Sequence, residues 1–277
     1  MCIYPPPSQK NLLHFFNACD IINYHTIQGV AADMDTAMQN TVTAAGMSQA
    51  GEPLTFIGTS HGDPGGFDSL YARLHDIRPD AVLLEVSWFS LFFRKTAGAV
   101  LKRIFLRNIR SLGITMTPEL HTIESFFDIP FEYRAVKQFC REEGVTYHLV
   151  DLPFISFLRL LKSHRLVYRK NLLLLSGFTG NRAQQEMSLA KRLFAEQDDC
   201  TVDIILSRIS KDRLGVKRER KLAEKIIRYR GKYSGRSIAY IGGWEHLLED
   251  PKQRTLYSMV PMRKQRTLAF VSPPEKK

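Results

Sequence analysis

The feature that most constrains the fold is the alternation, from residue 51 onward, of short apolar runs with longer segments of helical periodicity. Leu54 to Gly58 is an apolar run that stops at a glycine, which predicts a β-strand. Phe67 to Ile77 follows, with apolar residues at helical spacing. Because strands separated by helices are joined by crossovers, this alternation predicts an α/β fold with a mainly parallel central sheet flanked by helices on both faces. The other predicted strands are Ala81 to Val86, Ile114 to Thr117, Val145 to Val150, Val202 to Leu206 and Ser237 to Ile241, and the other predicted helices are Ala99 to Leu112, Glu132 to Glu143, Ala183 to Glu196 and Val216 to Arg230.

The chain divides by composition into two parts. Residues 1–50 are rich in Ala, Met, Thr and Asn and are expected to form an N-terminal extension packed on one α/β domain, 51–277. No apolar run reaches the roughly 20 residues that span a bilayer, and the first residues lack the pattern of a secretory signal, so we expect a cytoplasmic protein without a transmembrane segment. The four cysteines are scattered, which argues against a thiolate zinc site and a disulfide framework.

Positive charge is concentrated in the second half of the chain. The formal net charge is +11, yet residues 1–100 hold five Lys/Arg against nine Asp/Glu. The segment from Arg208 to Arg236 has twelve basic residues and three acidic ones. It could bind an anionic partner such as phosphate, nucleic acid or a membrane surface, or it could be the solvated face of a helix.

Two histidines follow predicted strands in matching Gly-x-x-His turns. The first turn is Gly58-Thr-Ser-His61 and the second is Gly243-Trp-Glu-His246. Ligands of open parallel sheets bind outside the carboxyl ends of the strands, and glycine lets the backbone turn and approach a ligand closely. We therefore expect both imidazoles at one rim of the sheet, in an active cleft.

Three further charged residues are candidates for the same site. Glu85 ends a strand that is expected to be buried, where an unpaired carboxylate is costly; a salt bridge to an arginine is the structural alternative. Glu132 lies three and four residues before the apolar Ala135 and Val136, a spacing that puts it on the inward face of its helix. The alternative is an acid in the first turn of the helix, which the helix dipole favours. Arg218 has a similar position in a later helix, with solvated charge as its alternative. Asp63 and Glu245, beside the two histidines, are weaker candidates.

These segments, taken in order, resemble the TraB/PrgY/GumN family, which is related to the Tiki proteins and to the erythromycin esterase (EreA) and ChaN superfamily. The resemblance lies in Gly58-Thr-Ser-His61, Pro79-Asp80-Ala-Val-Leu-Leu-Glu85, Phe131-Glu132-Tyr-Arg-Ala135 with Gly144 and Asp151, Arg218-Glu-Arg-Lys-Leu-Ala223, and Ile241-Gly-Gly-Trp-Glu-His246. The closing turn departs from the family in its bulky Trp244 and acidic Glu245. The resemblance covers about residues 54 to 248 and implies an EreA/ChaN-like α/β fold with the histidines and glutamates facing one cleft.

The resemblance also implies a hydrolase that cleaves a peptide or ester bond. Two chemistries fit the candidate residues. His61, Glu85 and His246 could hold a divalent metal (Mn, Co, Fe or Zn) that activates water. Alternatively, one histidine is a general base oriented by a glutamate such as Glu132, while Arg218 stabilises the oxyanion.

Two functions without catalysis compete with the hydrolase. A binding protein of the same fold could hold haem or another small ligand through the same histidines. A protein that binds nucleic acid or membranes would use the basic segment instead, with an affinity that falls steeply with salt. No pattern in the sequence indicates the oligomeric state.

Overall fold

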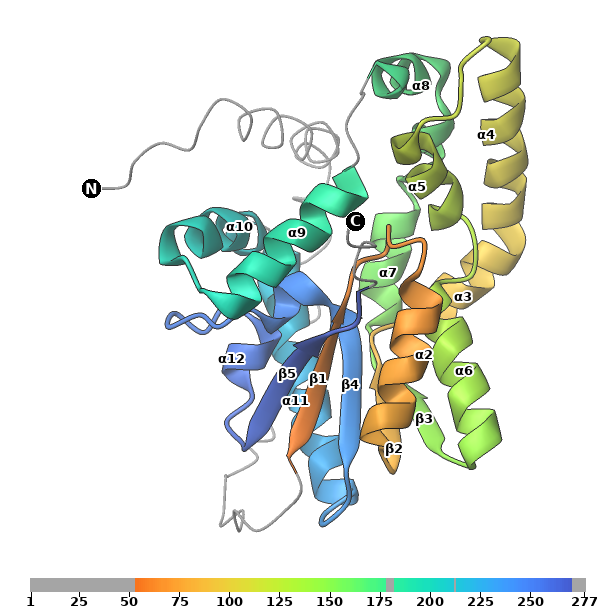
Figure 1. Ribbon diagram of the computed structural model, residues 1–277. Coiled ribbons are helices and arrows are strands. Elements are labelled where there is room, and N and C mark those ends of the chain that lie inside the picture. Colours follow the sequence, from red (N-terminus) through yellow and green to blue (C-terminus); the bar gives the residue numbers. More distant parts are fainter. Residues whose placement is uncertain (1–52, 178–181, 212, 271–277) are drawn as a thin grey trace, which may run out of the picture. The chain divides into compact units, whose positions relative to one another are not determined.

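The computed structural model describes residues 53–177, 182–211 and 213–270 (Figure 1). The predicted N-terminal extension lies outside these described residues. The strands are β1 (Leu54–Thr59), β2 (Ala81–Leu84), β3 (Thr146–Leu149), β4 (Ile238–Gly243) and β5 (Lys264–Leu268). The helices are α2 (Gly66–Ile77), α3 (Trp88–Phe93), η1 (Arg94–Gly98), α4 (Ala99–Ser111), α5 (Pro118–Phe126), α6 (Phe131–Glu143), α7 (Pro153–Leu160), η2 (Ser163–Val167), α8 (Arg169–Ser176), α9 (Arg182–Ala195), α10 (Asp199–Lys211), α11 (Arg213–Lys232), η3 (Trp244–Leu247) and α12 (Leu256–Met259).

The five strands form one sheet with the order β3-β2-β4-β1-β5, and every pairing is parallel. The fold class predicted from the alternation of strands and helices is therefore confirmed. Strands β1 and β4 lie side by side in the middle of the sheet, with Thr59 in register with Gly243. This register brings two segments that are almost two hundred residues apart in the sequence to the same edge.

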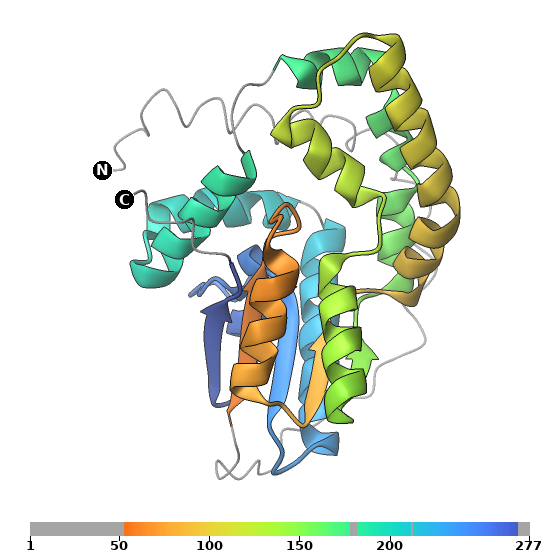
Figure 2. The ribbon, with the colours of Figure 1, turned by 45° about the vertical axis from the view of Figure 1, so that its right-hand side comes forward.

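Side chains alternate between the two faces of the sheet, as the period of two in a β-strand requires. On β1, Ile57 packs with α2 and α6 on one face, whereas Leu54 and Phe56 pack with α11 and α12 on the other. On β4, Ile241 belongs to the first face and Tyr240 to the second. Figure 2 shows α2 and α6 in front of the sheet and α11 behind it. Both faces are covered, which explains why the central strands are largely apolar.

Local signals fix where the elements near the site begin and end. Helix α6 ends at Gly144, whose backbone is left-handed with φ of 66°, a conformation that glycine adopts without a steric penalty. Helix α3 begins after Ser87, whose hydroxyl oxygen accepts a hydrogen bond from the backbone N–H of Ser90 at 3.1 Å. Helix α6 begins at Phe131, so Glu132 lies in its first turn, and α3 begins four residues after the end of β2.

Two predicted strands are wrong. Ile114 to Thr117 is a loop, in which Thr117 caps α5 by accepting a hydrogen bond from the N–H of Leu120. Val202 to Leu206 lies inside helix α10, where Val202, Ile205 and Leu206 are buried. Their spacing of three and four residues is that of one helix face. The predicted strand was wrong because a run of five residues is too short for its periodicity to distinguish a helix from a strand.

Strand β5 was not predicted. Its sequence, Lys264-Gln-Arg-Thr-Leu268, is largely polar because it is an edge strand that is only partly buried. Several short helices beyond the carboxyl ends of the strands were also missed, among them α3, α5, α7 and α8. In the part of the chain that the structure describes, no helix is both long enough and apolar enough to cross a membrane.

Candidate functional site

Each of the first four strands delivers a charged or imidazole side chain at its carboxyl end. His61 follows β1 by two residues, Glu85 follows β2 directly, and Asp151 follows β3 by two residues. His246 lies in η3, which continues from β4. The chain leaves β1 toward α2 on one face and leaves β4 toward α12 on the other. Neighbouring strands whose connections diverge in this way form the position where open parallel sheets bind ligands.

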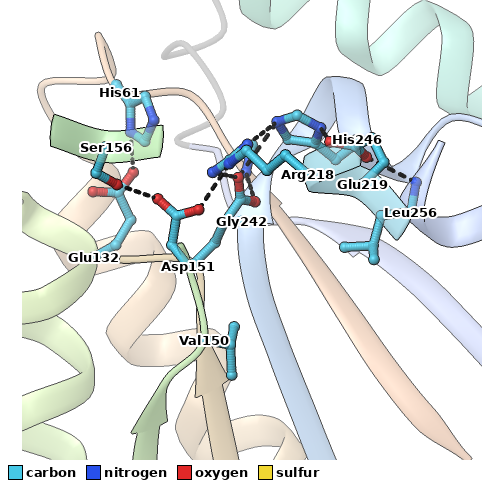
Figure 3. A network of polar contacts seen from close by, with 12 residues as sticks. His61, Glu132, Val150, Asp151, Ser156, Arg218, Glu219, Gly242, His246 and Leu256 are labelled. Carbon is cyan, nitrogen blue, oxygen red and sulfur yellow. Dashed lines mark hydrogen bonds and ion pairs between the residues drawn. The ribbon is translucent and has the colours of Figure 1, made fainter. Parts of the chain in front are cut away.

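The first group in the site is a hydrogen-bonded pair of His61 and Glu132. The Nδ1 atom of His61 lies 2.6 Å from Oε1 of Glu132 (Figure 3). The same carboxylate oxygen accepts a hydrogen bond from the hydroxyl of Thr59 at 3.1 Å. The Glu132 side chain is only 3% exposed, whereas that of His61 is 77% exposed. A buried carboxylate thus holds the Nδ1 edge of a solvent-accessible imidazole.

The electrostatics of this pair favour the charged form of both partners. The negative charge of Glu132 raises the pKa of His61 above its ordinary value, against the opposing effect of desolvation. Burial would raise the pKa of Glu132, but His61 and the hydroxyl of Thr59 outweigh it, so the pKa is lowered. The second oxygen of Glu132, Oε2, is buried without a hydrogen-bond partner among the described residues.

The second group is centred on Arg218, whose guanidinium bridges two strand ends. Its Nη2 donates to Oε1 of Glu85 at 2.5 Å, and its Nε donates to Oδ1 of Asp151 at 2.7 Å (Figure 3). The other oxygen of Asp151 accepts a hydrogen bond from the hydroxyl of Ser156 at 2.8 Å. Arg218 is buried, and the two carboxylates provide the compensation that a buried cation needs.

Glu85 has both of its oxygens occupied. Besides the bond to Arg218, its Oε2 accepts hydrogen bonds from the hydroxyl of Tyr240 at 2.6 Å and from the N–H of Gly243 at 3.2 Å. Burial would raise the pKa of Glu85, but His246, Arg218 and the Tyr240 hydroxyl lower it to about 2. A Cβ at position 242 would lie 2.0 Å from Oε2 of Glu85. The glycine at this position therefore leaves room for the carboxylate.

His246 completes the second group. Its Nδ1 lies 2.7 Å from Oε1 of Glu219, and its Nε2 lies 3.4 Å from both Oε1 of Glu85 and Nη1 of Arg218. Glu219 is buried, and its other oxygen accepts the N–H of Leu256 at 2.9 Å. Burial lowers the pKa of His246, but Glu219 and Glu85 outweigh it and raise the pKa to about 9.

The structure thus places all five predicted site residues at the carboxyl edge of the sheet, in two groups. His61 and Glu132 form one, and Glu85, Arg218 and His246 form the other. Thr59 lies between them: its one hydroxyl hydrogen can be donated to Oε1 of Glu132 or to the carbonyl of Gly242, which lies 3.2 Å from the hydroxyl oxygen. Asp63, a weaker candidate, accepts a hydrogen bond from the N–H of Gly65 at 2.9 Å, a contact typical of a turn.

Several residues of the site were not identified as site residues from the sequence. Asp151 could have been found by the argument used for Glu85, because it also follows a strand. Glu219 could have been found by the argument used for Glu132, because it precedes buried Leu222 and Ala223 by three and four residues. Tyr240 gave no signal, since within a strand its ring is part of the core and only its hydroxyl reaches the site.

The donor atoms do not fit a metal ion held by His61, Glu85 and His246. Both oxygens of Glu85 are engaged by other donors, and the Nε2 of His246 faces the guanidinium of Arg218. Within the described ranges, no three His, Cys, Asp or Glu side chains are gathered in a way that could hold a metal. Because these donor atoms are already engaged within the protein, the predicted metal gains no support from this geometry and stays a prediction.

Comparisons with protein-family models, with curated proteins and with solved structures found no match to the chain. The resemblance to the TraB/PrgY/GumN family therefore stays a prediction. What the fold and the geometry define is an α/β protein with two histidine–carboxylate pairs and a buried arginine at the carboxyl edge of a parallel sheet.

Proposed function

We propose that the protein is a hydrolase that cleaves a peptide or carboxylic ester bond, with His61 as the general acid/base. The observation that carries this proposal is the 2.6 Å contact between the exposed imidazole of His61 and the buried carboxylate of Glu132. A carboxylate on Nδ1 fixes the tautomer and orientation of an imidazole and leaves Nε2 for proton transfer. The exposure of the ring makes Nε2 accessible to water and substrate.

The proposed reaction requires the neutral form of His61, which is populated as the pH rises through its raised pKa. Nε2 of neutral His61 accepts a proton from a water molecule while the water oxygen attacks the carbonyl carbon of the substrate. The carbonyl π electrons move to the carbonyl oxygen and form a tetrahedral oxyanion. When this intermediate collapses, the bond to the leaving group breaks, and Nε2 returns the proton to the leaving oxygen or nitrogen. Glu132 remains ionised and stabilises the imidazolium that exists between the two proton transfers.

The second group supplies positive charge for the oxyanion. Protonated His246 and Arg218 present Nε2 and Nη1, two N–H donors 3.4 Å apart. The carboxylates of Glu85 and Glu219 keep both cations in place, so the donors are oriented before the charge develops. Donors that are fixed in advance in a site with little water are the most effective stabilisers of a developing negative charge.

Hydrolysis of p-nitrophenyl acetate, p-nitrophenyl butyrate and a fluorescein-labelled casein by the full chain tests the proposal. We expect turnover of at least one of these substrates and a loss of about 100-fold or more in kcat/KM in His61→Asn, the range that removal of a general base produces. His121→Asn is the matched control, because His121 is also exposed and lies 3.4 Å from a glutamate, Glu124, and neither residue belongs to the two groups of the site. The proposal fails if no substrate is cleaved, or if both variants retain wild-type rates.

A further inference from the structure

Large apolar side chains that are exposed to solvent occur in only two segments of the described chain, 88–111 and 153–176. The first segment comprises α3, η1 and α4, and the second comprises α7, η2 and α8. The exposed side chains are Trp88, Phe92, Val100, Phe154, Phe157, Leu161, Tyr168, Leu173 and Leu174. Single exposed apolar residues need no explanation, but a concentration of them marks a surface that binds something.

Five of these side chains belong to one patch on two packed helices. On α3, Trp88 and Phe92 are four residues apart and share a face. Phe154 and Phe157 on α7, with Leu161 directly after its last residue, share a face at spacings of three and four. The ring of Phe89 joins the two helices, because its centroid lies 6.0 Å from that of Trp88 and 5.2 Å from that of Phe157. We call these five residues the apolar patch.

The charge of the same two segments is entirely positive. Together they contain eleven Lys and Arg and no Asp or Glu. The basic residues are Arg94, Lys95, Lys102, Arg103, Arg107, Arg110, Arg159, Lys162, Arg165, Arg169 and Lys170. Lys102 forms ion pairs with Glu124 and Asp128, but the two segments still carry a large excess of positive charge. A partner that covers this surface is therefore expected to offer apolar contact and negative charge at the same time.

We propose that the apolar patch and the surrounding basic residues dock the protein on the surface of an anionic lipid membrane. Trp and Phe favour the boundary between headgroups and acyl chains, and Lys and Arg around them are attracted to anionic headgroups. Short helices with apolar side chains on one face and basic residues nearby can lie in this boundary without crossing the bilayer. Single-stranded nucleic acid could stack its bases on the four aromatic rings of the patch, but it fits the two segments less well as a whole. Their other exposed apolar residues include Val100, Leu161, Leu173 and Leu174, which offer bases no stacking surface.

The docking surface is built on the same helices that extend from the candidate site. Helix α3 begins three residues after Glu85, and α7 begins two residues after Asp151. On α7 the hydroxyl of Ser156 points inward to Asp151, while Phe154 and Phe157 are exposed. Docking would thus hold the carboxyl edge of the sheet close to the membrane. The proposal does not depend on catalysis, because it concerns binding alone.

Co-sedimentation of the full chain with lipid vesicles tests this inference. We expect binding to vesicles of equal parts phosphatidylcholine and phosphatidylserine, little binding to phosphatidylcholine alone, and weaker binding as salt is raised. The double variant Trp88→Ser, Phe154→Ser should lose about tenfold or more in affinity, since each removed ring gives up apolar burial. Both side chains are exposed, so the variant should unfold at the wild-type temperature.

The matched control reverses charge on another basic surface. Arg220→Glu with Arg228→Glu on α11 changes the net charge as strongly as Lys95→Glu with Arg103→Glu in the segment 88–111, and all four residues are exposed. Docking through the patch predicts that only the Lys95 and Arg103 pair weakens vesicle binding. Equal losses in both pairs would show attraction by net charge alone and overturn the proposal, as would wild-type protein that ignores anionic vesicles. Self-association that the patch variant abolishes, without vesicle binding, would assign the surface to a second copy of the chain.

Discussion

Replacing Glu219 by Gln removes one negative charge beside His246 and should lower the pKa of that histidine. The substitution keeps the shape of the side chain, and the Gln oxygen can still accept the N–H of Leu256, which Glu219 binds at 2.9 Å. What changes is the contact of 2.7 Å between Oε1 of Glu219 and Nδ1 of His246. Glu219 and Glu85 together outweigh burial and raise the His246 pKa from 6.5 to about 9.

The magnitude follows from this shift. A difference of 2.5 between 9 and 6.5 corresponds to about 3 kcal/mol of preference for the protonated form, at 1.36 kcal/mol per pKa unit. The side chain of His246 is only 18% exposed, so solvent screens little of this attraction. An opposite charge in direct contact shifts a pKa by about 1–3 units, and we expect the Glu219→Gln variant to lose a shift of that size.

The sign of the effect on stability can be worked out from the raised pKa. Protonated His246 stabilises the folded state fully below pH 6.5, and this stabilisation is lost as the pH rises through about 9. The wild-type free energy of unfolding should therefore fall by up to about 3 kcal/mol from this group between those pH values. In Glu219→Gln the same loss should be smaller and complete at lower pH.

Titration of the imidazole by NMR and urea unfolding at pH 6 and pH 9 measure the two consequences. Glu224→Gln is the control, because Glu224 lies on the same helix, is exposed and contacts Lys221 instead. An unchanged His246 pKa in Glu219→Gln, or an equal change in both variants, would refute the reasoning.

Three further predictions concern the rest of the site. Arg218→Met leaves the carboxylates of Glu85 and Asp151 buried without their cation, and should reduce the free energy of unfolding by about 3–5 kcal/mol in urea denaturation; a loss no larger than that of a surface substitution would contradict the network. Gly242→Ala places a methyl group where Oε2 of Glu85 lies, so it should displace the carboxylate and lower the melting temperature, and a variant as stable as the wild type would show that this contact is wrong. Because the donor atoms of the site are engaged with one another, prolonged dialysis against EDTA should leave any hydrolytic activity unchanged, whereas loss of activity restored by Zn²⁺ or Mn²⁺ would return the metal to the mechanism.

The sequence predicted those parts of the fold in which the hydrophobic pattern is decisive. Strands β1, β2 and β4 are buried on both faces, so their residues form apolar runs that are easily found. The edge strand β5 is partly solvated and carries no such run. At Val202 to Leu206 the pattern was ambiguous, because five residues fit either period and only the packing against neighbouring elements decides between them.

The site was predictable where a polar residue occurs at a position that should be apolar. Glu85 and Glu132 were found on that ground; their side chains are 6% and 3% exposed, and both are paired. The pairing itself was not predictable: that Glu132 binds His61 and that Glu85 binds Arg218 depends on the order of the strands. The position of β4 between β1 and β2 decides which strand ends are neighbours, and it is a property of the whole sheet.

The central claim, that His61 is the acid/base group and that Glu132 sets its pKa, is tested most directly by two titrations of the same two proteins. The pKa of His61 is measured by NMR, and the acid limb of kcat/KM is measured for an ester that the protein hydrolyses, in the wild type and in Glu132→Gln. Because Glu132 is the largest cause of the raised His61 pKa, the substitution should lower it, and the acid limb should move to lower pH by the same amount. An acid limb that stays in place while the pKa of His61 falls would contradict the account.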